Sequence, residues 1–156
     1  LRPRTAADNA TPSGNGMMLL SSAETGEPVA FLADAGLLTD VRTAAAAAMV
    51  AREIGRSDGV LGILGTGIQA RLQARMHAAI LGLEQIRIWG RNSLRTMECV
   101  RDLEAALPGI EILTASTPDE VARNAKLIVT TTAERAHLLW YEDVQYGTHV
   151  SAVGSD

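Results

Sequence analysis

The sequence predicts an α/β fold in which a parallel β-sheet is covered by helices on both faces. From residue 60 onward, short apolar runs alternate with helical patterns, which is typical of successive β-α-β units. The first of these units has a glycine-rich turn between its strand and its helix. The composition fits one packed domain, because 47% of the 156 residues are apolar and 14 are glycine.

The elements before residue 60 differ in character from those after it. Two short apolar segments, 17–22 and 28–34, are separated by turn-forming residues and predict a β-hairpin. A helix is expected over 38–55, because five consecutive alanines favour helix formation, Thr39 is a common N-cap residue type and Gly55 favours termination. Its small side chains predict close packing against a neighbouring element.

The alternating part of the chain predicts five strands and three helices. The last of the helices should begin with a capping box, in which Thr117 is the N-cap, Pro118 takes the first helical position and Glu120 completes the motif. The expected strands cover 60–64, 86–90, 110–113, 127–132 and 148–154, and the expected helices cover 70–82, 93–107 and 117–125.

Charge and cysteine content exclude several classes of function. The net charge of −4 and the pI near 5.4 provide no basic field, so we expect neither a nucleic acid nor a membrane as partner. The single cysteine, Cys99, cannot form an internal disulfide, and no apolar leader or membrane-length run is visible. We therefore expect a cytoplasmic protein in which Cys99 is structural.

The histidines predict no metal site. His77, His137 and His149 match no metal-ligand spacing, and each is expected to be either exposed or satisfied by a hydrogen bond.

The glycine turn of the first β-α-β unit matches a dinucleotide-binding fingerprint. Gly65, Thr66 and Gly67 follow the expected strand, and Ala70 takes the third place of the motif, where only close packing is needed. Such a turn brings backbone N–H groups and a helix N-terminus to a pyrophosphate. The alternative is a turn with a purely structural role. With its context, the motif predicts a Rossmann-type fold that binds a nicotinamide dinucleotide.

The residues at the end of the next expected strand bear on whether the chain prefers NAD or NADP. An acidic residue that would hold the ribose 2′-hydroxyl of NAD is absent, and Gly90, Arg91 and Asn92 stand there instead. An arginine can pair with a 2′-phosphate, and the glycine is expected to leave room for it. NADP(H) is therefore favoured and NAD(H) is the alternative. Arg91 could also be a solvated residue at the start of a helix.

Four spaced motifs together resemble the ornithine cyclodeaminase/mu-crystallin family: "LLTDVRTAAAAAMVA", "GILGTGIQARLQ", "IVTTT" and "GTHVSAVGSD". The segment "TPSGNGMMLLSSAETG" is most similar to the ectoine-utilisation branch. The resemblance covers residues 12 to 156 and implies a chain about twice as long, so we expect a fragment that is incomplete as an enzyme. It also implies two domains, with 1–36 the remnant of a substrate and dimerisation domain and 37–156 the dinucleotide-binding domain.

The resemblance also assigns roles to individual residues. It implies that Arg42 contacts the substrate carboxylate and the cofactor, and that Asp156 exchanges a proton with the substrate nitrogen. Alone, Arg42 would be read as a surface ion-pair partner and Asp156 as a loop carboxylate. Ser13 falls near a family position that contacts the cofactor. The other expected cofactor contacts are Gly65, Thr66, Gly67, Ile68, Gln69, Arg91, Asn92, Thr130, Thr131, Val153 and Gly154.

Three functions are compatible with this resemblance. The favoured one is an NAD(P)-dependent oxidoreductase that acts on the C–N bond of a small imino or amino acid, in a homodimer of the full-length protein. The first alternative is a cyclodeaminase, a lyase that releases ammonia and recycles its bound NAD. The second is an NADPH-dependent binding protein like mu-crystallin, which is disfavoured because two Trp and one Phe offer little surface for an aromatic ligand.

Overall fold

A computed structural model describes residues 16–55, 57–132 and 137–154. The chain divides into two compact units between Arg42 and Thr43, and each unit is described by itself. The first contains the expected hairpin, formed by the antiparallel strands β1 (Met18–Ser21) and β2 (Pro28–Leu32). Its turn is closed by the N–H of Gly26, which donates to the carbonyl of Ser22 at 3.0 Å.

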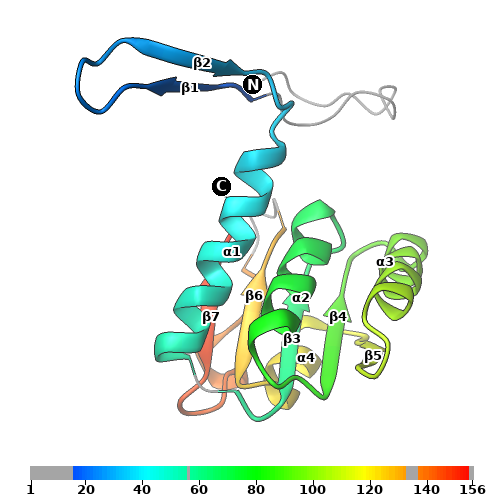
Figure 1. Ribbon diagram of the computed structural model, residues 1–156. Helices are drawn as coiled ribbons and strands as arrows, with labels where there is room; N and C mark the ends of the chain where they lie inside the picture. Colours follow the sequence, from blue (N-terminus) through cyan, green and yellow to red (C-terminus); the bar gives the residue numbers. More distant parts are fainter. Residues whose placement is uncertain (1–15, 56, 133–136, 155–156) are drawn as a thin grey trace. The chain divides into compact units, whose positions relative to one another are not determined.

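The second unit is built on a five-stranded parallel sheet in the order β5-β4-β3-β6-β7 (Figure 1). The chain builds β3, β4 and β5 outward in one direction, then returns to the other side of β3 for β6 and β7. The direction of strand addition therefore reverses between β3 and β6, where open α/β sheets bind ligands. The strands are β3 (Val60–Leu64), β4 (Gln85–Trp89), β5 (Glu111–Thr114), β6 (Leu127–Thr130) and β7 (His149–Ala152).

Helices cover both faces of this sheet, as the alternating pattern predicted. On one face, buried residues of α2 (Ile68–Ile80) and α3 (Ser93–Ala106) pack with the side chains of β3, β4, β5 and β6. On the other face, α4 (Pro118–Asn124) packs with Leu64 and Ile128, and the segment 138–144, which includes the 3₁₀ turn η1 (Tyr141–Asp143), adds apolar contacts.

Helix α1 (Leu37–Ile54) ends as expected and begins earlier than expected. It stops before Gly55, but its first residue precedes Thr39 by two positions. Thr39 is therefore not the N-cap; the carboxylate of Asp34 accepts the N–H of Leu38 at 2.6 Å instead.

The alanine run gives the C-terminal part of α1 a face of small side chains. Ala44, Ala48 and Ala51 are buried, at the spacing of one helical face, and Ala51 joins the core cluster that α2 and α3 share with the sheet. This confirms the expected close packing of the alanines. Among the described residues, no helix is both long and apolar enough to cross a membrane.

Candidate functional site

The glycine turn lies at the carboxyl end of β3, beside the point where strand order reverses. Gly65 has a φ of +134°, a backbone conformation that L side chains rarely adopt. A Cβ at this position would also overlap the hydroxyl of Thr131, which follows β6. The N–H of Gly65 donates to the carbonyl of Trp89 at 2.8 Å, and the N–H of Thr131 donates to Leu64 at 2.8 Å. The turn is thus fixed between both neighbouring strands.

The N-terminus of α2 leaves its first N–H groups without a side-chain cap. Gly67 is the N-cap residue, and a Cβ there would meet no atom of the described residues within 4 Å. The first turn carries no acidic residue, so no carboxylate competes for the helix dipole. Ile68 is exposed, and Gln69 is half-buried with its amide oxygen 3.4 Å from the amide nitrogen of Gln73. This end of the helix can accept a phosphate group.

Arg71 holds the carbonyl side of the turn, a role that sequence reasoning missed. Its Nη1 donates to the carbonyl of Thr66 at 2.6 Å and to that of Gly67 at 3.3 Å. Its Nε and Nη2 both pair with Asp102 Oδ2 of α3 at 2.7 Å. Arg71 therefore ties the turn to α3 and holds the two carbonyl oxygens in place. No motif spacing signals this contact, because it depends on how α2 packs against α3.

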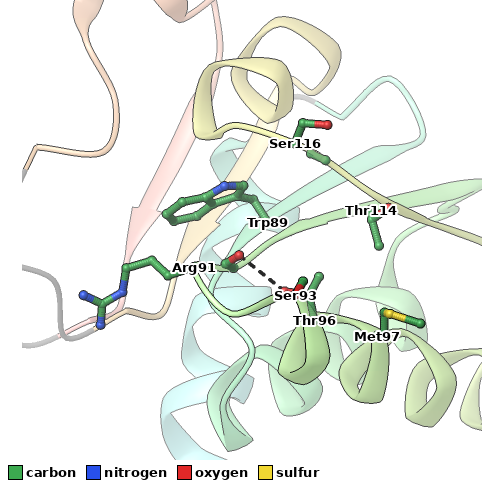
Figure 2. Close-up of a pocket in the computed structure, with 9 residues that line it drawn as sticks. Trp89, Arg91, Ser93, Thr96, Met97, Thr114 and Ser116 are labelled. Carbon is green, nitrogen blue, oxygen red and sulfur yellow. Dashed lines mark hydrogen bonds between the residues drawn. The ribbon is translucent and has the colours of Figure 1, made fainter.

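A cleft of about 660 Å³ opens at the carboxyl ends of β4 and β5 (Figure 2). It lies beyond the glycine turn, on the side of the sheet that β4 and β5 form. Arg91 is exposed at its edge, and Figure 2 shows Thr96 and Met97 of α3 on one side and Trp89 and Ser116 on another. The full lining consists of Trp89, Gly90, Arg91, Ser93, Thr96, Met97, Thr114, Ala115 and Ser116. Most of these residues were not predicted, since β5 contributes no recognisable motif.

The structure corrects the interpretation of Gly90. The space where its side chain would stand is occupied, since a Cβ there would overlap the methyl group of Thr66 and lie 2.7 Å from Thr96 Oγ1. The glycine thus lets the turn and α3 approach the end of β4, and it does not leave room for a phosphate. Asn92 is the N-cap of α3, and its side-chain oxygen accepts the N–H of Arg95 at 3.0 Å.

The expected contacts on the other side of β3 lie together at the ends of β6 and β7. The carbonyl of Thr130 accepts the N–H groups of Val153 at 3.0 Å and Gly154 at 2.9 Å. Since Thr131 packs on Gly65, these residues and the glycine turn border the same carboxyl edge of the sheet.

Three expected site residues are not tested by the structure. Arg42 is exposed on α1 and is the last residue of the first compact unit, whereas the glycine turn belongs to the second. Ser13 and Asp156 lie outside the described residues. The roles of all three stay predictions from the family resemblance.

The buried histidine departs from expectation. His77 is fully buried in α2, and its Nδ1 donates to the carbonyl of Gln73 at 2.8 Å, but its Nε2 has no hydrogen-bond partner among the described residues. Burial lowers the pKa of His77 below its ordinary value of 6.5; the hydrogen bond to the Gln73 carbonyl partly offsets this, and His149 has a smaller lowering effect. Burial therefore favours the neutral ring, and only one of its two nitrogens has a hydrogen-bond partner in the described part of the chain. Within the described segments, no three His, Cys, Asp or Glu side chains are grouped as metal ligands.

These features define a class of domain. Taking β3 as the first strand, the parallel order corresponds to 3-2-1-4-5, with a glycine turn at the reversal point and helices on both faces, which is a domain of the Rossmann type. The chain belongs to the ornithine cyclodeaminase/mu-crystallin family, whose model matches residues 3–156. The family resemblance is thereby confirmed, while its ectoine-utilisation branch stays a prediction.

Two relatives illustrate the sequence similarity. An uncharacterised cyclodeaminase of Sinorhizobium fredii is 40% identical over 146 residues, which are 93% of this chain and 44% of that protein. An ornithine cyclodeaminase of Agrobacterium tumefaciens is 34% identical over 141 residues, which are 88% of this chain and 39% of that protein. The chain therefore spans less than half the length of these relatives.

Solved structures with the same fold include three enzymes with bound nicotinamide cofactors. An archaeal alanine dehydrogenase dimer with NAD has a TM-score of 0.80 at 28% identity, over 92% of this chain and 43% of that one. The iminosuccinate reductase of Paracoccus denitrificans with NAD⁺ has a TM-score of 0.80 at 28% identity, over 91% and 43%. The Δ1-pyrroline-2-carboxylate reductase of Thermococcus litoralis with NADH and L-proline has a TM-score of 0.78 at 26% identity, over 87% and 42%.

Proposed function

We propose that this chain is the dinucleotide-binding part of a cytoplasmic NAD(P)-dependent oxidoreductase that acts on the C–N bond of a small imino or amino acid. The observation that carries the proposal is the turn at the strand reversal, where Gly65 packs on Thr131 beside the uncapped start of α2. The relatives support it, since they include an alanine dehydrogenase and two reductases, each solved with NAD, NAD⁺ or NADH.

The site divides into two ends around the phosphate turn. The N–H groups of Gly67 and Ile68 would hold the pyrophosphate, and the cleft beyond β4 and β5 would take the adenosine end. Thr130, Val153 and Gly154 would border the nicotinamide at the ends of β6 and β7. A bound nicotinamide supplies or accepts a hydride at the α-carbon of the substrate.

The family resemblance completes the proposal for the substrate. The guanidinium of Arg42 would hold the substrate carboxylate in a bidentate pair, because the two groups match in geometry and charge. The carboxylate of Asp156 would take or return the proton on the substrate nitrogen. Because the chain covers less than half of its relatives, we expect other substrate contacts in a longer protein.

We further propose NADP(H) as the preferred cofactor, with Arg91 as the contact for the 2′-phosphate. Arg91 lines the cleft directly after β4, where its guanidinium can pair with a phosphate, and the described residues that line the cleft include no carboxylate. A preference for NADPH suits net reduction of an imine. Calorimetric titration of both cofactors tests this proposal.

The expected result is tighter binding of NADPH than of NADH. Replacing Arg91 by alanine should weaken NADPH binding about tenfold and change NADH binding less than about twofold. Arg101→Ala is the matched control, because Arg101 is exposed on α3 and does not line the cleft. Equal or tighter binding of NADH would contradict the role of Arg91.

That contrary outcome would favour the cyclodeaminase as the second candidate. The similarity to an ornithine cyclodeaminase at 34% identity supports this candidate directly. In such an enzyme the hydride is returned to the substrate, so ammonia is released with no net change in the cofactor. Release of ammonia from a diamino acid without accumulation of NADH would identify it.

The hairpin supports a proposal on domain organisation and assembly. Leu19 and Phe31 are paired on one face, Leu20 and Leu32 lie on the other, and all four are exposed. A two-stranded hairpin with two apolar faces is not stable alone. We propose that residues 1–36 belong to the substrate and dimerisation domain of a homodimer. Sedimentation of the purified protein and a Phe31→Lys variant tests this, with weaker self-association expected for the variant.

A further inference from the structure

The contact between the phosphate turn and the end of β4 leaves no room for a side chain at position 90. A Cβ on Gly90 would overlap the methyl group of Thr66 and lie 2.7 Å from the hydroxyl oxygen of Thr96. Real Cβ atoms essentially never lie closer than 3.0 Å to a neighbouring heavy atom. Any other residue at position 90 therefore requires these two threonines to move.

Thr96 is held by burial and by its hydrogen bonds. It is 5% exposed, and its hydroxyl donates to the carbonyl of Asn92 at 2.9 Å, with the carbonyl of Gly90 at 3.4 Å (Figure 2). Rotation about the Cα–Cβ bond of Thr96 would either place its methyl group in the same space or leave the hydrogen there, and in both cases the hydroxyl would lose its hydrogen bond to Asn92. Clearing the space therefore costs the buried hydroxyl its partner.

Thr66 is held through its backbone. Its carbonyl accepts from Arg71 at 2.6 Å, and Arg71 is anchored to Asp102 of α3. The preceding residue, Gly65, has a φ of +134° and packs on Thr131, so the turn cannot retreat on that side. A side chain at position 90 would push on the same turn whose N–H groups are proposed to hold the pyrophosphate.

We propose that Thr66 and Thr96 are specificity-determining residues, which together exclude an acidic side chain from position 90. A carboxylate at the end of β4 would accept a hydrogen bond from the 2′-hydroxyl of NAD(H) and would repel the 2′-phosphate of NADP(H). Because the two threonines require glycine at position 90, the carboxylate that would select NAD(H) is absent, and Arg91 determines the preference. The inference rests on the proposed dinucleotide site. It deepens that proposal, because it gives two uncharged residues, Thr66 and Thr96, a part in the choice of cofactor beside Arg91.

The steric part is tested with a single methyl group. Gly90→Ala adds a Cβ and no charge, so it should weaken NADPH and NADH binding together, by about tenfold. In a Thr66→Ala/Thr96→Ala background, which lacks the opposing atoms, the same change should weaken binding less than about twofold. Binding is read from the fluorescence of Trp89, which lines the cleft, in a Trp140→Phe background. Thermal unfolding of the same four proteins gives a second readout that needs no cofactor.

The charge part is tested with Gly90→Asp. Alone, this change should weaken both cofactors together. Combined with Thr66→Ala and Thr96→Ala, it should raise the affinity for NADH relative to NADPH by at least about tenfold. The double-alanine protein without Gly90→Asp is the reference, and the shift toward NADH is measured relative to its own ratio of NADPH to NADH affinity.

Three results would overturn the inference, and they differ from failure of the proposed function. The first is a switch toward NADH by Gly90→Asp alone, with the threonines in place. The second is an equal effect of Gly90→Ala in both backgrounds. The third is an unchanged preference in the combined variant. Failure of the proposed function would appear earlier, because the unmodified protein would then bind neither cofactor.

Discussion

At the scale of single residues, the two glycines of the phosphate turn have different physical roles. Gly65 adopts a positive φ and packs on Thr131, whereas Gly67 has a φ of −82° and open space where a Cβ would stand. The first glycine is thus needed for the fold. The second meets no steric requirement from the described part of the chain, so we expect it to matter where a ligand approaches its backbone closely.

Paired alanine substitutions should separate these roles. Gly65→Ala should lower the free energy of unfolding by about 2–4 kcal/mol, from backbone strain and overlap with Thr131. Gly67→Ala should change it by less than about 0.5 kcal/mol and still weaken dinucleotide binding at least tenfold, because the new methyl group would block the pyrophosphate. Denaturant unfolding and cofactor titration measure the two effects. Unchanged binding in Gly67→Ala would argue that the turn is only structural.

His77 should make the stability of the protein depend on pH. Its pKa in the folded protein lies below the ordinary value of 6.5, because burial disfavours the charged ring, so the unfolded chain binds the additional proton first. The contribution of neutral His77 to the free energy of unfolding should therefore be fully present above pH 6.5. It should fall as the pH drops below that value, with a limiting slope of about 1.4 kcal/mol per pH unit.

His77→Leu removes the titrating ring and fills a similar volume. The difference in unfolding free energy between the two proteins should therefore change with pH between about 5 and 7, in favour of the variant at the acidic end. Urea unfolding at several pH values measures it. Parallel pH profiles for the two proteins would show that His77 does not titrate in this range.

At the scale of elements, Arg71 links the start of α2 to α3 through the phosphate turn. Arg71→Ala should weaken dinucleotide binding about tenfold, because the carbonyl groups of Thr66 and Gly67 lose their donor and the turn loosens. Asp102→Asn should have a smaller effect, of less than about threefold, because Asp102 is largely exposed and Arg71 keeps its contacts with the turn.

The matched control for that comparison is Arg75→Ala. Arg75 lies one turn further along α2 and is exposed, so its loss removes a like charge without touching the turn. Cofactor titration of the three variants measures the effects. An equal loss in Arg71→Ala and Arg75→Ala would mean that only the positive charge of α2 matters.

The elements show which local signals are reliable. The N-cap of α4 was predicted correctly, because Thr117 accepts the N–H of Glu120 at 3.3 Å and both residues are close in sequence. The carboxylate of Glu120 reaches back as in a capping box, but it accepts the backbone N–H of Ser116 at 2.7 Å, one residue before the N-cap. The N-cap of α1 was predicted wrongly, because α1 begins at Leu37 and the carboxylate of Asp34, not Thr39, accepts a free N–H at its start. Residue-type preference alone does not show which of several nearby Asp and Thr residues caps a helix.

The cleft marks the limit of prediction from local pattern. Sequence spacing located the glycine turn and Arg91 because both follow strands at fixed offsets in one β-α-β unit. It could not show that Thr66 and Thr96 fill the space above Gly90, because that contact joins a turn, a strand end and a helix. The sequence therefore showed that no acidic residue stands at position 90, but it did not show the contacts that leave no room for one.

At the scale of the whole molecule, the proposed dinucleotide contacts that the structure describes, apart from Arg42, lie in the second compact unit. The glycine turn, the cleft and the ends of β6 and β7 all belong to it, whereas β1 and β2 belong to the first unit. A ligand that binds only the folded form of one unit stabilises that unit by mass action. Cofactor binding should therefore stabilise the second unit more than the first.

Hydrogen exchange with and without NADPH should make this inequality visible. At a free concentration about a hundredfold above Kd, the slowest amides of β3, β4 and β6 should gain about 2.7 kcal/mol of protection, since they exchange only when the bound unit opens. The amides of β1 and β2 should gain almost none, and they serve as the internal control within the same sample. Equal gains in both units would mean that the cofactor also stabilises the first unit, through the contacts predicted at Ser13 and Arg42.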